Sequence, residues 1–295
     1  MSVYNASGVQ LSALYDLGGE DAERAYDISG DQVFSKAPVP QPGYDYDSYT
    51  ISNIFSYSQS NMQSFAVYGG KIAQVKQTDA IHILDIATGT KLKEVAMNTG
   101  HGNSSQFSDE FYAQGDEFPL FYVRNDGVWV YRITGTTSTL VKKLAFSADI
   151  IGTYVAGFGI DNANRRFYTA SYTTGDYISK DGLLRICVWD MDDVTDQGDG
   201  VYSMALLDSN DLTWFDTYEA VQGCCYRDGY FFIACGYGTG QQYVVLVDTD
   251  TLTITHRVSL TGAEIEGCGW YGDEYLIVGQ GPNSIAYKKI TFATL

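Results

Sequence analysis

Short apolar segments separated by turn residues recur along most of the chain. Near the C-terminal end, residues 221–233 and residues 265–277 have nearly the same pattern. Each begins with a strand of small residues, continues through the turn Asp228-Gly229 or Gly272-Asp273, and ends in a strand of aromatic and aliphatic residues. Such dipeptides favour the positive φ angles of tight hairpins. A repeat of this length made only of strands is typical of β-propeller blades.

From residue 48 onward the predicted strands fall into groups. We place the groups at 64–96, 118–146, 154–207, 219–259 and 264–291. The last group has three evident strands, and the segment Tyr49–Tyr57 is expected to supply its outer strand and so close the ring without an exposed edge. The sequence therefore predicts an all-β fold, a five-bladed propeller with six blades as the alternative.

Two corners between a third and a fourth strand also match each other. They are Ile81–Gly89 and Tyr243–Thr251, and each is an aliphatic strand followed by a turn. The turn contains Asp, Thr and Gly in the first segment and Asp and Thr in the second. In this pattern residues 48–295 resemble the YVTN and WD40-like propeller families. The resemblance implies an architecture, and it implies no single function because propellers host many.

The N-terminal residues 1–36 carry a second, shorter repeat. A Tyr-Asx pair and a glycine turn recur every eleven residues, beginning at Tyr4, Tyr15 and Tyr26. Three units of this size cannot bury a core alone, so we expect them to attach to a protein partner or to another copy of the chain. The alternative is an extension that lies on its own propeller. Residues 37–47, which hold three of the five prolines, are predicted to be a stiff linker to the propeller at 48–295.

This layout, with the repeats at 1–36 ahead of a spacer and a compact β domain, resembles tail-tip or baseplate proteins of phages that infect gut bacteria. The resemblance implies that the N-terminal segment attaches to the virion and that the C-terminal domain contacts the host surface. It also implies synthesis in the cytoplasm, in keeping with an N-terminus that shows no basic and apolar signal sequence.

Composition excludes several classes of partner. The net charge of −18 argues against binding to nucleic acid or to anionic membranes, and no apolar run is long enough to span a bilayer. The five cysteines are Cys187, Cys224, Cys225, Cys235 and Cys268. Their odd number and spacing favour buried thiols in a reducing compartment over disulfides or a zinc site.

Polar and aromatic residues are predicted to meet at the mouth of the central channel. Gln63, Gln222 and Glu266 occupy the same position in three blades, and the longer loops are expected on the same face. Aromatic rings with amide and carboxyl groups suit sugars. The candidate ligand-binding residues are Gln63, His101, Asn103, Tyr177, Trp214, Tyr218, Gln222, Tyr237 and Glu266. The plainer interpretation is a solvated channel lined by polar residues.

The sequence favours a non-catalytic binding protein of the virion, with a surface glycan or protein as ligand. The first alternative is a carbohydrate-active enzyme of the glycoside hydrolase type, which needs two carboxylates. Its candidate catalytic residues are Glu266, Glu219, Glu264 and His101, with Asp109 and Glu110 as further acids. The second alternative is a scaffold propeller that only assembles with neighbours.

An acidic insertion at residues 190–200 is the one candidate metal site. Its carboxylates, which could bind calcium, are Asp190, Asp192, Asp193, Asp196 and Asp199. The segment lacks the spacing of an EF-hand loop and its closing glutamate, so a solvated, charged turn is favoured and no cofactor is expected.

Overall fold

The computed structural model divides the chain into two units, Met1–Gly43 and Tyr44–Leu295. The described residues are 43–173, 183–214, 218 and 220–295, together with four short strands in the first unit. Those strands form two antiparallel pairs, β1 (Val3–Tyr4) with β2 (Gln10–Leu11) and β3 (Arg24–Tyr26) with β4 (Gln32–Ser35). The turns of the N-terminal repeat and the three prolines of the predicted linker lie outside the described residues.

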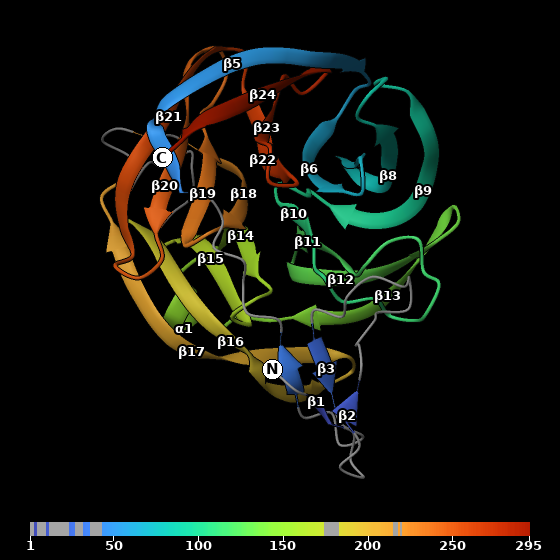
Figure 1. The fold of residues 1–295 in the computed structure, drawn as a ribbon. Helices are drawn as coiled ribbons and strands as arrows, with labels where there is room; N and C mark the ends of the chain where they lie inside the picture. The colour runs from blue at the N-terminus through green and yellow to red at the C-terminus, as the bar shows by residue number, and fades with distance from the viewer. Residues whose placement is uncertain are drawn as a thin grey trace. The chain divides into compact units, whose positions relative to one another are not determined.

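The second unit is built almost entirely from strands, and its inner strands surround a common centre (Figure 1). The prediction of an all-β chain is confirmed. The first group of antiparallel strands consists of β6 (Met62–Tyr68), β7 (Lys71–Lys76), β8 (Thr78–Asp85) and β9 (Lys91–Gly100). The second consists of β10 (Ser105–Phe107), β11 (Phe121–Asn125), β12 (Gly127–Thr134) and β13 (Thr137–Leu144). The third consists of β14 (Tyr154–Asp161), β15 (Arg166–Tyr172), β16 (Leu184–Gly198) and β17 (Val201–Leu212).

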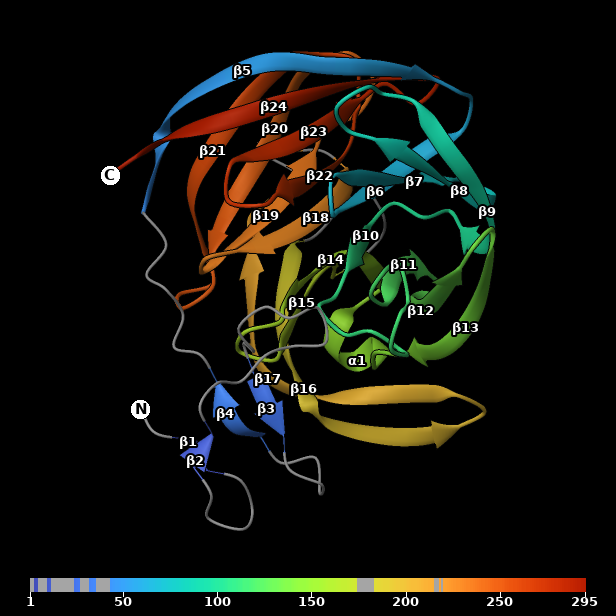
Figure 2. The same ribbon diagram turned by 45° about the vertical axis from the view of Figure 1, so that its right-hand side comes forward.

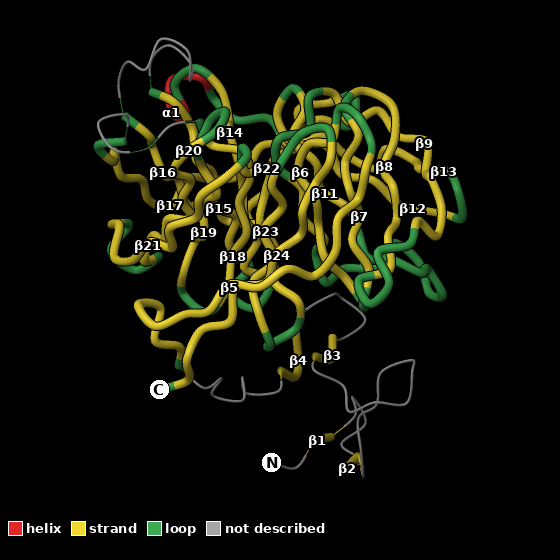
Figure 3. The backbone as a smooth tube through the Cα atoms, turned by 90° about the horizontal axis from the view of Figure 1, so that it is seen from above, coloured by secondary structure: helices red, strands yellow, loops and turns green. Residues whose placement is uncertain are grey.

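The remaining strands form two separate four-stranded sheets. These are β18 (Val221–Arg227), β19 (Tyr230–Cys235), β20 (Gly240–Asp248) and β21 (Thr253–Gly262), and then β22 (Ile265–Tyr271), β23 (Tyr275–Gln280), β24 (Ser284–Thr294) and β5 (Tyr44–Ser58). A short helix, α1 (Ala148–Ile151), precedes β14. The loops gather at the two ends of the strands (Figure 3).

The N-terminal strand of this unit completes its last sheet. β5 pairs antiparallel with β24, from Tyr44 opposite Thr294 to Ser58 opposite Ser284. Tyr46 of β5 is buried and packs edge-on against Phe292, with ring centroids 5.0 Å apart. The predicted contribution of Tyr49–Tyr57 as an outer strand is therefore confirmed. The strand begins earlier than expected, because residues 44–47, assigned to the linker, already belong to it.

One of the two predicted two-residue turns has the expected backbone, whereas the turn at Gly272-Asp273 spans three residues between Tyr271 and Tyr275, and only Gly272 in it has a positive φ angle. Asp228 and Gly229, between β18 and β19, have φ angles of 47° and 81°. Two consecutive positive φ angles match the right-handed twist of the flanking strands, which is why an Asp-Gly dipeptide stands there.

Two strand predictions were wrong. The second group begins with the three-residue strand β10, which pairs with β11 and which the sequence analysis missed. The acidic insertion is not a turn, because β16 and β17 continue through it as one long hairpin that reaches beyond the neighbouring sheets (Figure 2).

In the described residues no helix is both long enough and apolar enough to cross a membrane.

Candidate functional site

Four of the inner strands have an irregularity at the same place. The pairing of β6, β14, β18 and β22 with the next strand shifts between Met62 and Phe65, Val155 and Gly157, Val221 and Gly223, and Ile265 and Gly267. A β-bulge leaves a residue without a ladder partner and re-aims its side chain. The residues freed in this way include Gln63, Ala156, Gln222 and Glu266.

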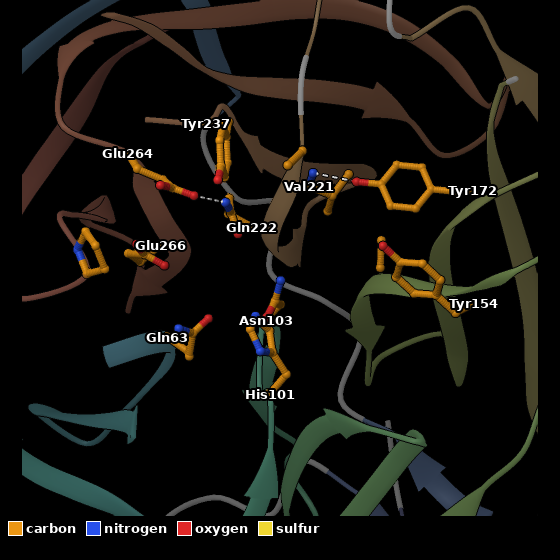
Figure 4. A pocket seen from close by; sticks show the side chains of 13 residues that line it. Gln63, His101, Asn103, Tyr154, Tyr172, Val221, Gln222, Tyr237, Glu264 and Glu266 are labelled. Carbon is orange, nitrogen blue, oxygen red and sulfur yellow. Dashed lines mark hydrogen bonds between the residues drawn. The ribbon is translucent and has the colours of Figure 1, made fainter. Parts of the chain in front are cut away.

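All four of these residues line one cavity of about 230 Å³. Figure 4 shows Gln63, Gln222 and Glu266 extending into it from different strands. The complete lining is Gln63, His101, Asn103, Tyr154, Ala156, Tyr172, Ala220, Val221, Gln222, Tyr237, Glu264, Glu266 and Pro282. The bulges therefore build a central site with one contribution from each of these four strands.

A period of two residues adds a second layer to the same wall. His101 and Asn103, Tyr154 and Ala156, Ala220 and Gln222, and Glu264 and Glu266 are four such pairs, and every member lines the cavity. Extended backbone directs residues i and i+2 to the same side, so β14, β18 and β22 with the residues just before them each supply two side chains, whereas His101 and Asn103 flank Gly102 in a turn.

Glycine brings the inner strands together around this site. A Cβ atom on Gly223 would lie 2.8 Å from the Cα atom of Gly267 and 3.3 Å from the carbonyl oxygen of Asn103. Ser64 Oγ donates a hydrogen bond to the carbonyl oxygen of Gly102 at 2.5 Å and fixes the loop that carries Asn103. The small residues next to Gln222 and Glu266 are needed for close approach of backbone to backbone.

Two glutamates form the acidic side of the cavity. Glu266 is 3% exposed, and burial, with Glu264 nearby, raises the pKa of its carboxyl to about 9. Glu264 accepts hydrogen bonds from Gln222 Nε2 and, at 3.2 Å, from the backbone N–H of Gly238. At neutral pH Glu266 therefore holds its proton and lies beside Glu264.

His101 lies on the other side of the cavity. Its Nδ1 accepts a hydrogen bond from Gln77 Nε2 at 2.9 Å, which leaves the ring proton on Nε2. Burial and the nearby Arg124 guanidinium lower the pKa of His101 below its usual value. Arg124 stacks over the ring of Tyr154 at 5.0 Å and donates from Nε to the carbonyl oxygen of Val155 at 3.0 Å. This side is therefore neutral at the imidazole and positive at Arg124.

Three tyrosines complete the walls. Tyr172 is buried, and its hydroxyl oxygen accepts a hydrogen bond from the backbone N–H of Val221 at 2.8 Å. Tyr154 is half-buried, and Tyr237 is 56% exposed at the edge of the cavity. An exposed ring at the edge of a polar cavity offers a face for stacking by an incoming ligand.

The cavity unites most of the residues singled out in the sequence. Those that line it are Gln63, His101, Asn103, Gln222, Tyr237, Glu264 and Glu266. Tyr177 and Glu219 lie outside the described residues. Asp109 and Glu110 do not line it, and Glu110 instead pairs with Arg165 at 2.5 Å.

Trp214 and Tyr218 differ from the prediction that they populate a binding face. Both are buried in the core between β15, β16 and β20, with ring centroids 4.7 Å apart, and Tyr218 packs edge-on against Tyr243. Their apolar rings gain more from burial than from a place on the loop surface. Tyr154 and Tyr172, which do line the cavity, were missed, although Tyr154 could have been found from its spacing to the inner-strand bulge.

The candidate calcium ligands are distributed along the β16–β17 hairpin. Asp190 pairs with Arg166 at 3.2 Å, and Asp192 pairs with Arg165 at 2.9 Å. Over residues 43–173, 183–214, 218 and 220–295, no group of three or more His, Cys, Asp or Glu side chains is arranged to hold a metal ion.

No protein-family model matches the chain, and no curated protein matches its sequence. Among solved structures, 835 chains match it. One is the crystal structure of glutaminyl cyclase from Myxococcus xanthus, with a TM-score of 0.51 and 10% sequence identity over 82% of this chain and 97% of that chain. At this identity the likeness shows the fold alone, which is all-β and propeller-like. A fold shared by so many chains does not select a function.

Proposed function

We propose that this chain is a non-catalytic binding protein of a virion or similar appendage, and that its central cavity recognises one sugar residue of a surface glycan. Grouping of the strands of residues 44–295 into five sets of four supports a five-bladed propeller. In this proposal residues 1–36 attach the chain to its particle or to another copy. The eleven-residue repeat that begins at Tyr4, Tyr15 and Tyr26 supports this role.

The observation that carries the binding proposal is the set of four matching bulges. A β-bulge interrupts the hydrogen-bond ladder between two strands, and bulges are common next to functional sites because they re-aim a side chain. Here the bulges direct Gln63, Gln222 and Glu266 into one cavity, beside Asn103 and under the exposed ring of Tyr237. Amide and carboxyl groups exchange hydrogen bonds with sugar hydroxyls, while an aromatic face stacks on the C–H face of a sugar ring.

Glycan-array binding by the purified full-length chain tests this proposal. The comparison is with a Tyr237→Ala, Glu266→Gln double variant, which changes the cavity and leaves the core intact. We expect saturable binding by the wild type and its loss in the double variant. Binding by neither protein, or equal binding by both, would contradict the proposal and favour a scaffold role.

A second candidate is an enzyme that uses Glu266 as a general acid. Its support is the raised pKa of Glu266, since a carboxyl protonated at neutral pH can donate to a leaving group, with Glu264 beside it as a second acid. Turnover of a panel of polysaccharides tests this candidate. It requires activity that Glu266→Gln abolishes.

A further inference from the structure

Two polar groups on the acidic side of the cavity have no hydrogen-bond partner among the described residues. The Glu266 carboxyl is almost fully buried, and no hydrogen bond joins it to another described residue. Asn103 Oδ1 is also buried and has no hydrogen-bond partner among the described residues. A buried polar group without a hydrogen-bond partner is costly, so Glu266 and Asn103 Oδ1 on one cavity indicate a ligand that hydrogen-bonds to both.

Charge selects among ligands of this kind. Glu264 and Glu266 are the acidic groups here, and the side-chain amide of Gln222 that contacts Glu264 is neutral. Arg124 lies on the His101 side, where it is engaged with Tyr154 and Val155. A phosphate or carboxylate would bring only acceptors and a like charge. A primary ammonium group brings three N–H donors, no acceptor and a positive charge.

The cavity volume limits the size of the group that enters. About 230 Å³ is less than the roughly 300–1,000 Å³ typical of sites for drug-sized ligands, so the cavity accepts one small residue. Tyr237 at its edge is exposed, so the ring that carries the amine can contact it.

We propose that the cavity binds a primary ammonium group against Glu264, Glu266 and Asn103, and that the recognised sugar is therefore an amino sugar with a free amine. The identity of the sugar rests on the proposed function, whereas the ammonium site stands on the geometry alone.

Binding should be coupled to release of a proton. The bound ammonium group faces a Glu266 carboxylate, so the proton that Glu266 holds at neutral pH leaves to solvent and no covalent bond changes. The other titratable groups around the cavity are Glu264, His101, Arg124 and the three tyrosines. His101 is neutral above pH 7 because its pKa is lowered, and Arg124 stays charged. Affinity should then rise with pH until the amine of the ligand itself loses its proton.

Calorimetry on the full-length chain tests this inference with three probes that differ only at one ring position. The probes are methyl glucosaminide, its N-acetylated form and methyl glucoside, and ethylamine serves as an amine without a sugar. We expect methyl glucosaminide to bind at least tenfold more tightly than the other two sugars. Its affinity should rise by several-fold from pH 6 to pH 7, with about one proton released per ligand.

Two variants locate the effect. Glu266→Gln keeps the shape of the side chain and should weaken methyl glucosaminide binding at least tenfold. Glu274→Gln, an exposed glutamate in the β22–β23 turn of the same sheet, should change nothing. Retention of binding by Glu266→Gln would overturn the inference.

The outcomes separate the two proposals. Equal or tighter binding of the neutral sugars would overturn the ammonium site and leave glycan recognition standing. If ethylamine bound and none of the three sugars did, the result would support the ammonium site and contradict glycan recognition. Binding of none of the four probes would overturn the ammonium site.

Discussion

The Gln222 side-chain amide donates a hydrogen bond from Nε2 to Glu264 Oε1, across the boundary between two separate four-stranded sheets. Gln222 is also the residue that the bulge of β18 leaves unpaired. The same amide therefore lines the cavity and joins two neighbouring sheets.

A double-mutant cycle measures this link. Gln222→Leu and Glu264→Leu, singly and together, should give a coupling free energy of about 1–2 kcal/mol, because a hydrogen bond to a charged group at a partly solvated site is worth roughly that much. Urea unfolding of the four proteins provides the values. A coupling near zero would mean that the bond does not join the sheets energetically.

Protonation of Glu266 should make stability depend on pH. In the unfolded chain its carboxyl ionises above the ordinary pKa of 4.5, whereas in the folded chain it keeps its proton up to about pH 9. The folded state thus binds more protons in this interval, and its free energy of unfolding falls as pH rises. The free energy of unfolding of Glu266→Gln, relative to that of the wild type, should therefore increase by about 3 kcal/mol from pH 4.5 to pH 7. Urea unfolding at several pH values checks this, and parallel curves would contradict it.

The close approach of Gly223 to Gly267 should leave no room for a Cβ atom on Gly223. Gly223→Ala places a Cβ atom against backbone and should cost about 2 kcal/mol. Gly229→Ala, in an open turn with φ of 81° and nothing within 4 Å, should cost only backbone strain of about 1 kcal/mol. Denaturant unfolding distinguishes the two costs, and a smaller cost at Gly223 than at Gly229 would show that the inner strands separate easily.

The pairing of β5 with β24 should be essential for folding, whereas the N-terminal unit should be dispensable. A chain that begins at Tyr44 should unfold with the same midpoint as the full chain. A chain that begins at residue 59 lacks the outer strand beside β24 and exposes its edge, so it should lose cooperative unfolding. Tyr46→Ala should cost about 3 kcal/mol through the lost aromatic contacts. Unchanged unfolding of the chain from residue 59 would refute the role of this strand.

Repetition explains which features the sequence predicted. The Asp228-Gly229 turn and the outer strand of the last sheet follow from local residue chemistry and from the count of strands. Gln222 and Glu266 were found together because two copies of one pattern place them at the same position.

The missed features depend on contacts that no local pattern contains. β10 has only three residues, too few to show alternation, and Trp214 lies next to loop residues although its ring is buried. The raised pKa of Glu266 arises from burial among strands that are distant in sequence, so composition could not indicate it.

Filling the cavity tests the account most directly. Ala156, freed by the bulge of β14, is buried and lines the cavity, so Ala156→Leu occupies space without removing a polar group. Ala293→Leu adds the same volume at an exposed position of β24 and serves as the control. The measurement is the affinity for a glycan that the wild type binds. We predict at least a tenfold loss for Ala156→Leu with its thermal unfolding midpoint nearly unchanged, and no loss for Ala293→Leu. Undiminished affinity in a folded Ala156→Leu protein would contradict recognition in the central cavity.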